Sequence, residues 1–143
     1  YGMYSVSGEF AYDRPFLWGS KRTGPDLARI GNYRSVDWHE NHMKDPVSVV
    51  PGSIMPAYVH MFNKNADIET AYAEAVTVKK VFNVPYDMEG MPKLGSWEEA
   101  QAEVRAEAEA IVSQMKDQDV KDAFARGEIR QIVALIAYLN SLK

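Results

Sequence analysis

The amino-acid sequence predicts an all-α protein with long loops, and three observations carry this prediction. Apolar residues recur at spacings of three and four in several segments, and helix-start signals stand at the head of these segments. No run alternates apolar and polar residues as a half-buried strand would. The 143 residues suit one domain, and a content of 46% hydrophobic and 25% charged residues is typical of a globular chain with a core.

The first third of the chain combines irregular segments with short helices. Residues 1–25 are rich in Gly, Tyr, Phe and Trp and predict an irregular loop packed through its aromatic side chains. A short helical turn is expected to start near Pro25 and to stop at Gly31. The next helix has Ser35 as its N-cap and ends at Pro46.

The remaining helices are longer. Residues 66–82 repeat apolar side chains at helical spacing. The segment that follows the linker opens with a capping box made by Ser96 and Glu99, and its Ala-rich apolar face predicts a position on the surface. The last helix, at 128–142, carries a wide apolar stripe that needs a substantial partner and consists of Ile129, Ile132, Val133, Ile136 and Leu139.

Charge and cysteine content exclude several classes of function. The formal net charge of −4 gives no broad basic surface, so no nucleic-acid partner is expected. No run approaches the ~18 apolar residues of a membrane-spanning helix. With no cysteine, the 143 residues contain no disulfide, no thiolate metal site and no thioether attachment point for haem.

Three histidines are candidate metal ligands. His39, Glu40 and His42 resemble a metalloprotease signature, but that signature requires two His at i and i+4 and the spacing here is i and i+3. We interpret the pair as a surface or structural feature. A small metal enzyme that also uses His60 is an alternative hypothesis.

A local cationic cluster stands in this otherwise acidic chain. Its members are Lys21 and Arg22, with Arg14, Arg29 and Arg34. Such a cluster is either ordinary solvated charge or a clamp for carboxylates or phosphates, because guanidinium offers a planar bidentate fork. The surrounding segment lacks the spacing of a phosphate-binding P-loop.

Met55 lies in a loop between Pro51 and Pro56, in a stretch too broken for a helix or a strand. Taken alone, a loop methionine is more often a packing residue than a ligand. A thioether is also a known axial ligand of haem iron, and Met/His ligation raises the haem reduction potential. Flanking prolines would hold the sulfur in place before iron binds.

Several long segments together resemble a known family, the membrane-anchored mono-haem cytochrome c subunit (the second, FixO-like subunit) of cbb3-type cytochrome c oxidases. They follow the family's order over nearly the whole chain and read YGMYSVSGEFAYDRPFLWGSKRTGPDLARIG, DWHENHMKDPVSVVPGSIMPAY, NVPYD and ALIAYLNSL. The resemblance implies an all-α, cytochrome c-like domain at the periplasmic face of the bacterial inner membrane. It also implies electron transfer from another c-type haem to the catalytic haem-copper subunit that reduces oxygen, with the di-haem cytochrome c subunit as a second partner.

The resemblance also implies roles for particular residues. Met55 would be the distal axial ligand of the haem iron. Pro25 would pack near the proximal histidine and orient it through its carbonyl group. Arg22, Lys21 and Trp18 lie where contacts to the haem propionates are expected.

The chain departs from the family pattern at its start. In the family, C-x-x-C-H and its helix lie just before the position of Tyr1, so we expect the C-terminal portion of the subunit. Haem c would then belong to the parent protein, with no covalent haem in this fragment. We expect a single domain over 1–143 without the haem-attachment helix and with a helical insertion at about 66–126.

Without that helix, the apolar stripe of the last helix would lack its natural partner. We therefore expect rearranged packing or self-association through the helix at 128–142, because isolated monomers rarely expose several hundred Å² of apolar surface. An alternative to electron transfer is a non-haem module in which Met55 is a packing residue and the helices dock on a partner subunit.

Overall fold

Seven α-helices and one short 3-10 helix form the chain over residues 27, 29–89 and 93–143, which are the residues that the computed structural model describes. These residues contain no β-strand, so the predicted all-α class is confirmed, and none of their helices is long and apolar enough to cross a bilayer. In chain order the elements are η1 (Ile30–Asn32), α1 (Val36–Lys44), α2 (Pro46–Val49), α3 (His60–Asn63), α4 (Ile68–Phe82), α5 (Trp97–Gln114), α6 (Gln118–Ala125) and α7 (Gln131–Ser141).

The helix boundaries follow the capping signals of the sequence. The Ser35 hydroxyl accepts the backbone N–H of Trp38 at the start of α1. Both bonds of the predicted capping box are present at the start of α5, from the Glu99 N–H to the Ser96 hydroxyl (3.2 Å) and from the Ser96 N–H to the Glu99 carboxylate (2.9 Å). Helix α4 ends at Asn83, which adopts the left-handed conformation with φ of 51°.

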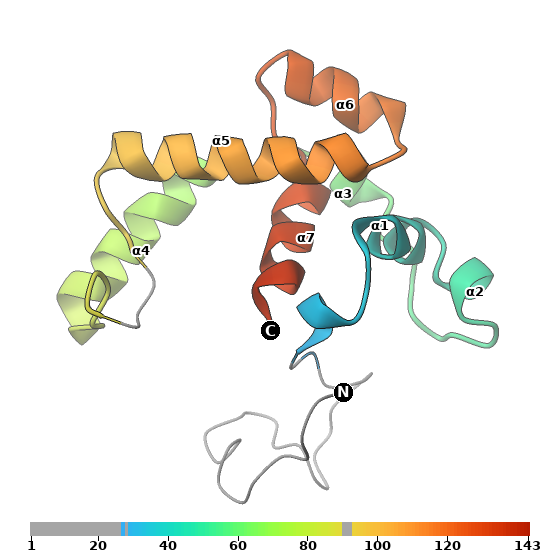
Figure 1. Cartoon of the computed structure of the whole chain (residues 1–143), viewed down its shortest axis with the longest axis horizontal. Helices are drawn as coiled ribbons and strands as arrows, with labels where there is room; N and C mark the ends of the chain where they lie inside the picture. Colours follow the sequence, from blue (N-terminus) through green and yellow to red (C-terminus); the bar gives the residue numbers. More distant parts are fainter. Residues whose placement is uncertain (1–26, 28, 90–92) are drawn as a thin grey trace, which may run out of the picture.

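Helix α7 lies at the centre of the core, and other helices of the same chain cover its apolar stripe. Ile132, Val133, Ile136 and Leu139 are all buried. Helices α5, α3 and α1 and the 3-10 helix η1 pack against α7 (Figure 1). The stripe is therefore covered within one chain. The buried stripe offers no exposed apolar surface for the self-association that we expected through the helix at 128–142.

Helix α5 corrects the expectation that the Ala-rich segment after Ser96 lies on the surface. Its first half is mostly exposed, but Ala108, Ile111 and Val112 in its second half are buried, as is Met115 just beyond its end. Figure 1 shows α5 running across α7, with α6 packed on its C-terminal end. Of the expected insertion at 66–126, the later part therefore contributes to the core.

Gly31 lies inside η1, although the sequence predicts that it stops a helical turn. A side chain at this position would collide with the backbone carbonyl of Asn140 at the end of α7. The Gly31 N–H also donates to the carbonyl of Leu142 at 2.8 Å. Gly31 is therefore a point of close approach between η1 and α7, since only a hydrogen fits there.

A buried carboxylate connects α1 to the corner between α5 and α6. Glu40 is 4% exposed, and its two oxygens accept the backbone N–H groups of Lys116 and Asp117, each at 2.8 Å. A buried charge is tolerated only where it is hydrogen-bonded, and bonds to an ionised acceptor are among the stronger ones. Glu40 thus joins two parts of the chain that lie far apart in the sequence.

Two ion pairs flank this carboxylate. Lys44 donates to Asp117, and Lys116 pairs with Asp37 at 2.7 Å. Burial raises the pKa of Asp117, but the hydrogen bonds from Lys44 and from the Val120 N–H outweigh burial and hold that pKa below its ordinary value. The corner between α5 and α6 is therefore held to α1 by charged side chains as well as by Glu40.

We predict that Glu40→Gln lowers the free energy of unfolding by about 1.5–3 kcal/mol, because it removes the charge from two buried hydrogen bonds. Urea denaturation followed by circular dichroism measures this difference. Glu103→Gln, at an exposed position of α5, is the matched control and should leave the midpoint unchanged. Equal midpoints for the two variants would contradict the role assigned to Glu40.

Candidate functional site

Of the residues that the family resemblance singles out, the structure describes Met55. The other four, Trp18, Lys21, Arg22 and Pro25, lie outside the described residues. Their expected contacts to haem propionates and to a proximal histidine therefore stay predictions.

The loop that carries Met55 is fixed at both ends. At its start, the Ser53 N–H donates to the carbonyl of Val50 (3.0 Å), and Gly52 supplies the positive φ of 81° that this turn requires. At its end, the Tyr58 N–H donates to the carbonyl of Met43 in α1 (2.8 Å). Between these points Met55 is half-buried, and its N–H donates to the Ser53 hydroxyl at 3.2 Å. The loop is therefore ordered by its own contacts.

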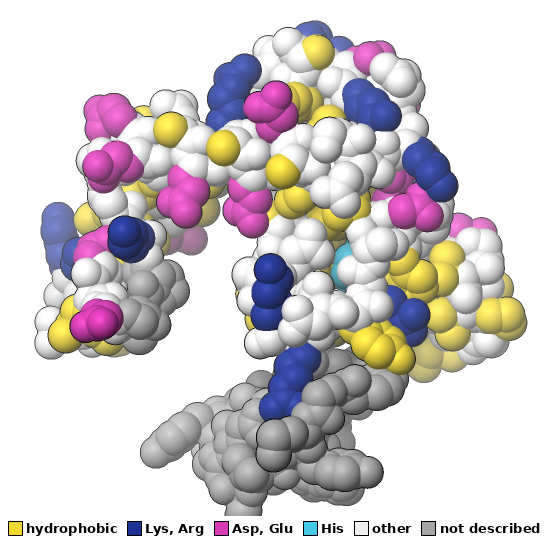
Figure 2. Space-filling model, in the orientation of Figure 1, with side chains coloured by type: hydrophobic (Ala, Val, Ile, Leu, Met, Phe, Trp, Pro, Cys, Tyr) yellow, Lys and Arg dark blue, Asp and Glu magenta, His cyan; other side chains and the backbone are white. Residues whose placement is uncertain are grey.

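Exposed hydrophobic side chains gather around this loop and the helices beside it. Figure 2 shows them at the end of the molecule that α1 and α2 form. Ile54, next to Met55, is 91% exposed. Of the ten large hydrophobic side chains that are exposed among the described residues, four belong to α2 and to the segment between α2 and α3: Val47, Val50, Ile54 and Val59. An apolar surface of this kind marks a site where another group binds.

A haem fits this surface on two counts. A porphyrin would cover exposed apolar side chains, and a thioether is one of the axial ligands that haem iron takes in cytochromes. Met55 places a soft ligand atom in the ordered loop. The 143 residues contain no cysteine, so any thioether attachment of a haem has to be made by residues outside them.

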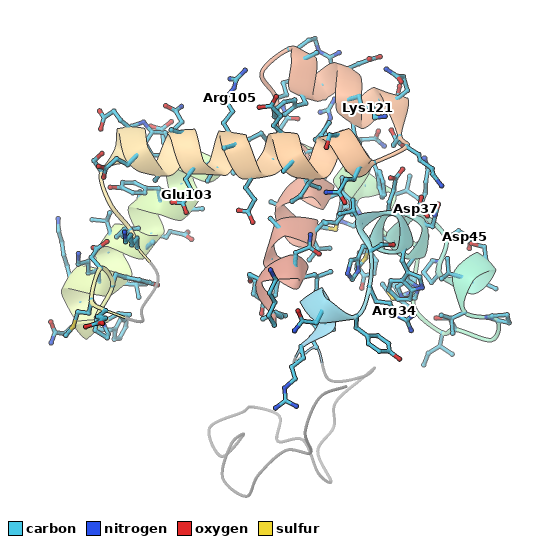
Figure 3. All side chains as sticks on the ribbon, in the orientation of Figure 1. Arg34, Asp37, Asp45, Glu103, Arg105 and Lys121 are labelled. Carbon is cyan, nitrogen blue, oxygen red and sulfur yellow. The ribbon has the colours of Figure 1, made fainter. Side chains whose placement is uncertain are left out.

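Two side chains of α1 form a stack with Arg34, which precedes the helix. The guanidinium of Arg34, which Figure 3 labels, lies 4.5 Å from the ring centroid of Trp38. The Trp38 ring stacks on His42, with centroids 4.4 Å apart and an interplanar angle of 20°. The sequence-based interpretation of Arg34 as a member of a cationic cluster did not predict its contact with the Trp38 ring. A signal for it is present, because Arg34, Trp38 and His42 are spaced at i, i+4 and i+8.

The two histidines of α1 are structural and uncharged at neutral pH. His39 is 1% exposed, and its ring meets Trp38 edge-on with centroids 5.4 Å apart. Burial lowers the pKa of His39, and the nearby His42 and Arg34 lower it further. Burial and the charge of Arg34 also lower the pKa of His42. Within the described part of the chain, His39 Nε2 and His42 Nδ1 are buried without a hydrogen-bond partner.

The alternative of a histidine metal site finds no support in the described residues. No group of three or more His, Cys, Asp or Glu side chains among them could hold a metal ion. His60 lies on α3, where its ring meets Tyr58 with centroids 5.9 Å apart. The interpretation of His39 as a structural residue agrees with its burial in α1.

We predict that the free energy of unfolding falls as the pH is lowered from 7 to 5. Both histidines have folded pKa values below the ordinary 6.5, so the unfolded chain binds more protons in this range and acid favours it. The double variant His39→Gln/His42→Gln should flatten this dependence, as measured by chemical denaturation at several pH values. The control Asn41→Ala, exposed on the same helix, should keep it. An unchanged slope in the double variant would show that other groups cause it.

Comparison with known families gives one match. The family described as "Cytochrome C oxidase, mono-heme subunit/FixO" matches residues 1–143, the whole of the chain. No curated protein matches the chain.

Proposed function

Because the chain belongs to the family of mono-haem FixO subunits of cytochrome c oxidase, we propose that it is part of an electron-transfer subunit in which Met55 is an axial ligand of the haem iron. The observation that carries this proposal is the position of Met55 in a loop fixed at both ends, beside the exposed hydrophobic side chains of α2 and of the loop itself. Membership of the family indicates a haem, and Met55 of the loop would be one of its axial ligands.

The loop would contribute to electron transfer mainly through rigidity. Bound haem iron supplies the redox chemistry, accepting and releasing one electron, and the protein sets its potential and solvent exposure. The contacts of Ser53 and Tyr58 hold the loop before iron binds, so little ordering entropy remains to be lost on ligation. The exposed hydrophobic side chains beside Met55 would exclude water from one side of the haem, and solvent access to a metal site is one of the factors that set its potential.

We further propose the wider arrangement that the sequence suggests. The subunit would belong to a cbb3-type oxidase at the periplasmic face of the bacterial inner membrane. It would pass electrons from another c-type haem to the catalytic haem-copper subunit and lie beside the di-haem cytochrome c subunit. Family membership supports the coarser part of this proposal, a haem-containing subunit of an oxidase complex in electron transport.

We predict that Met55→His in the haem-loaded oxidase lowers the reduction potential of the haem of this subunit, because Met/His ligation gives a higher potential than ligation without the thioether. Potentiometric titration followed by absorption spectroscopy measures the change. Met88→His is the matched control, since Met88 is also a loop methionine but is 62% exposed and lies beyond α4. Unchanged spectra and potential in Met55→His would refute the ligand role and favour a non-haem docking module.

A further inference from the structure

Helix α4 is apolar but has no buried residue. Most of its fifteen residues are Ala, Val, Ile, Phe or Tyr, and among the longer described helices only α7 is more hydrophobic. Val81 and Phe82 are nevertheless 67% and 73% exposed. Figure 1 shows α4 projecting away from the core as an arm below α5. A helix of this composition is normally buried against a partner, and the described residues of this chain do not provide one.

The apolar residues of α4 form a seam with the spacing of a helix-pairing surface. The seam follows alternating steps of three and four residues and consists of Ile68, Ala71, Ala75, Val78 and Phe82. Ala71 and Phe82 are exposed, and the other three residues are only half-buried. The small side chains of Ala71 and Ala75 allow the backbone of a second helix to approach closely. Five such positions cover two heptads, the length of a short helix–helix contact.

Contact between α4 and α5 leaves this surface incompletely covered. A cleft of about 650 Å³ separates the start of α4 from α5 and the segment before α7, and Ile68 lines it together with Trp97 and Phe124. The direct contact is aromatic, with the rings of Tyr72 and Trp97 5.2 Å apart. Packing among the residues that the structure describes therefore does not account for the apolar composition of α4.

The far end of the arm is held by one carboxylate. Asp87 accepts the N–H groups of Leu94 (2.6 Å) and Gly95 (3.0 Å) and pairs with Lys79 at 2.6 Å. The hydrogen bonds from Lys79, Gly95 and Leu94 lower the pKa of Asp87 to about 2. The Asp87 carboxylate therefore stays ionised, and its contacts persist, at any physiological pH. The Tyr72 hydroxyl also donates to the Gly95 carbonyl at 2.9 Å. The arm is therefore presented in a fixed conformation, which lowers the entropy cost of binding a partner.

The charge of α4 and the loop after it favours some binding partners of the seam over others. Residues 67–89 carry five acidic side chains and two lysines, a formal charge of −3. An anionic bilayer surface attracts basic segments and would repel this one. Two copies of the arm would repel each other for the same reason. A helix with an apolar face and basic flanking residues is complementary both to the apolar seam and to the negative charge around it.

We propose that the α4 seam is a docking surface for an α-helix, with basic residues beside its apolar face, from a neighbouring subunit of the oxidase. The proposal rests on membership of a family of oxidase subunits and is independent of the ligand role of Met55. Deleting the segment 96–115 would not test it, because that segment supplies Ile111, Val112 and Met115 to the core. The test has to address α4 alone.

The first experiment identifies the occupant by photo-crosslinking in native membranes. The probe is p-benzoylphenylalanine at position 82, a residue close to Phe in shape, in the assembled oxidase. The control has the same probe at Ala73, which is exposed and lies on the opposite side of α4 from the seam. An adduct with another oxidase subunit from position 82 only is the expected result. An adduct with a second copy of this chain, an adduct with lipid alone, or no adduct would overturn the proposal.

The second experiment measures the strength of docking. Val78→Asp/Phe82→Asp should reduce the amount of this chain that co-purifies with a tagged catalytic subunit by about tenfold, because it places charge in an apolar contact. Ala73→Asp adds the same residue type to the same helix and should leave recovery unchanged. Wild-type recovery of the double variant would overturn the proposal. The haem potential of any subunit recovered reports separately on Met55, so the two proposals can fail independently.

Discussion

The hydrogen bonds between the Glu40 carboxylate and the backbone at Lys116 and Asp117 set the position of α1 on the core. They fix α1 to the corner between α5 and α6, and α1 in turn carries Met43, whose carbonyl holds the end of the Met55 loop through Tyr58. The candidate ligand is therefore connected to the core through a short series of polar contacts. A charged group in this position also disfavours alternative packings of α1, because any of them would leave the carboxylate buried without partners.

Local signals in the sequence predict the helices well, since capping and periodicity act over a few residues. Ser35, the Ser96–Glu99 capping box and the end of α4 at Asn83 are where local chemistry places them. The sequence does not predict which faces meet. The Ala-rich face of α5 reads as a surface because Ala buries little area, yet its second half packs on α7. The role of Glu40 also depends on residues far away in the chain, which periodicity does not relate.

The candidate site also has some features that the sequence predicts and others that it does not. Prolines and a thioether are visible in the sequence, and together with the family resemblance they make Met55 the candidate ligand. The contacts of Ser53 and Tyr58 that order its loop are not predictable in this way, because one of them reaches a carbonyl of a separate helix. The Arg34–Trp38–His42 stack lies between these cases. Its residues are four apart in the sequence, but a charged residue in a cationic cluster gives no indication that it will lie over an aromatic ring.

The close approach of Gly31 to the end of α7 has a consequence for how the protein is made. Gly31 bonds to Leu142, so an early and a late segment of the described chain meet, and α7 supplies the centre of the core. The ribosome synthesises α7 after the other described helices, so the core cannot close until translation of this region is complete. Until then the apolar faces of α1 and of the second half of α5 lack the helix that covers them in the folded structure. Compact packing of this region therefore follows the synthesis of α7.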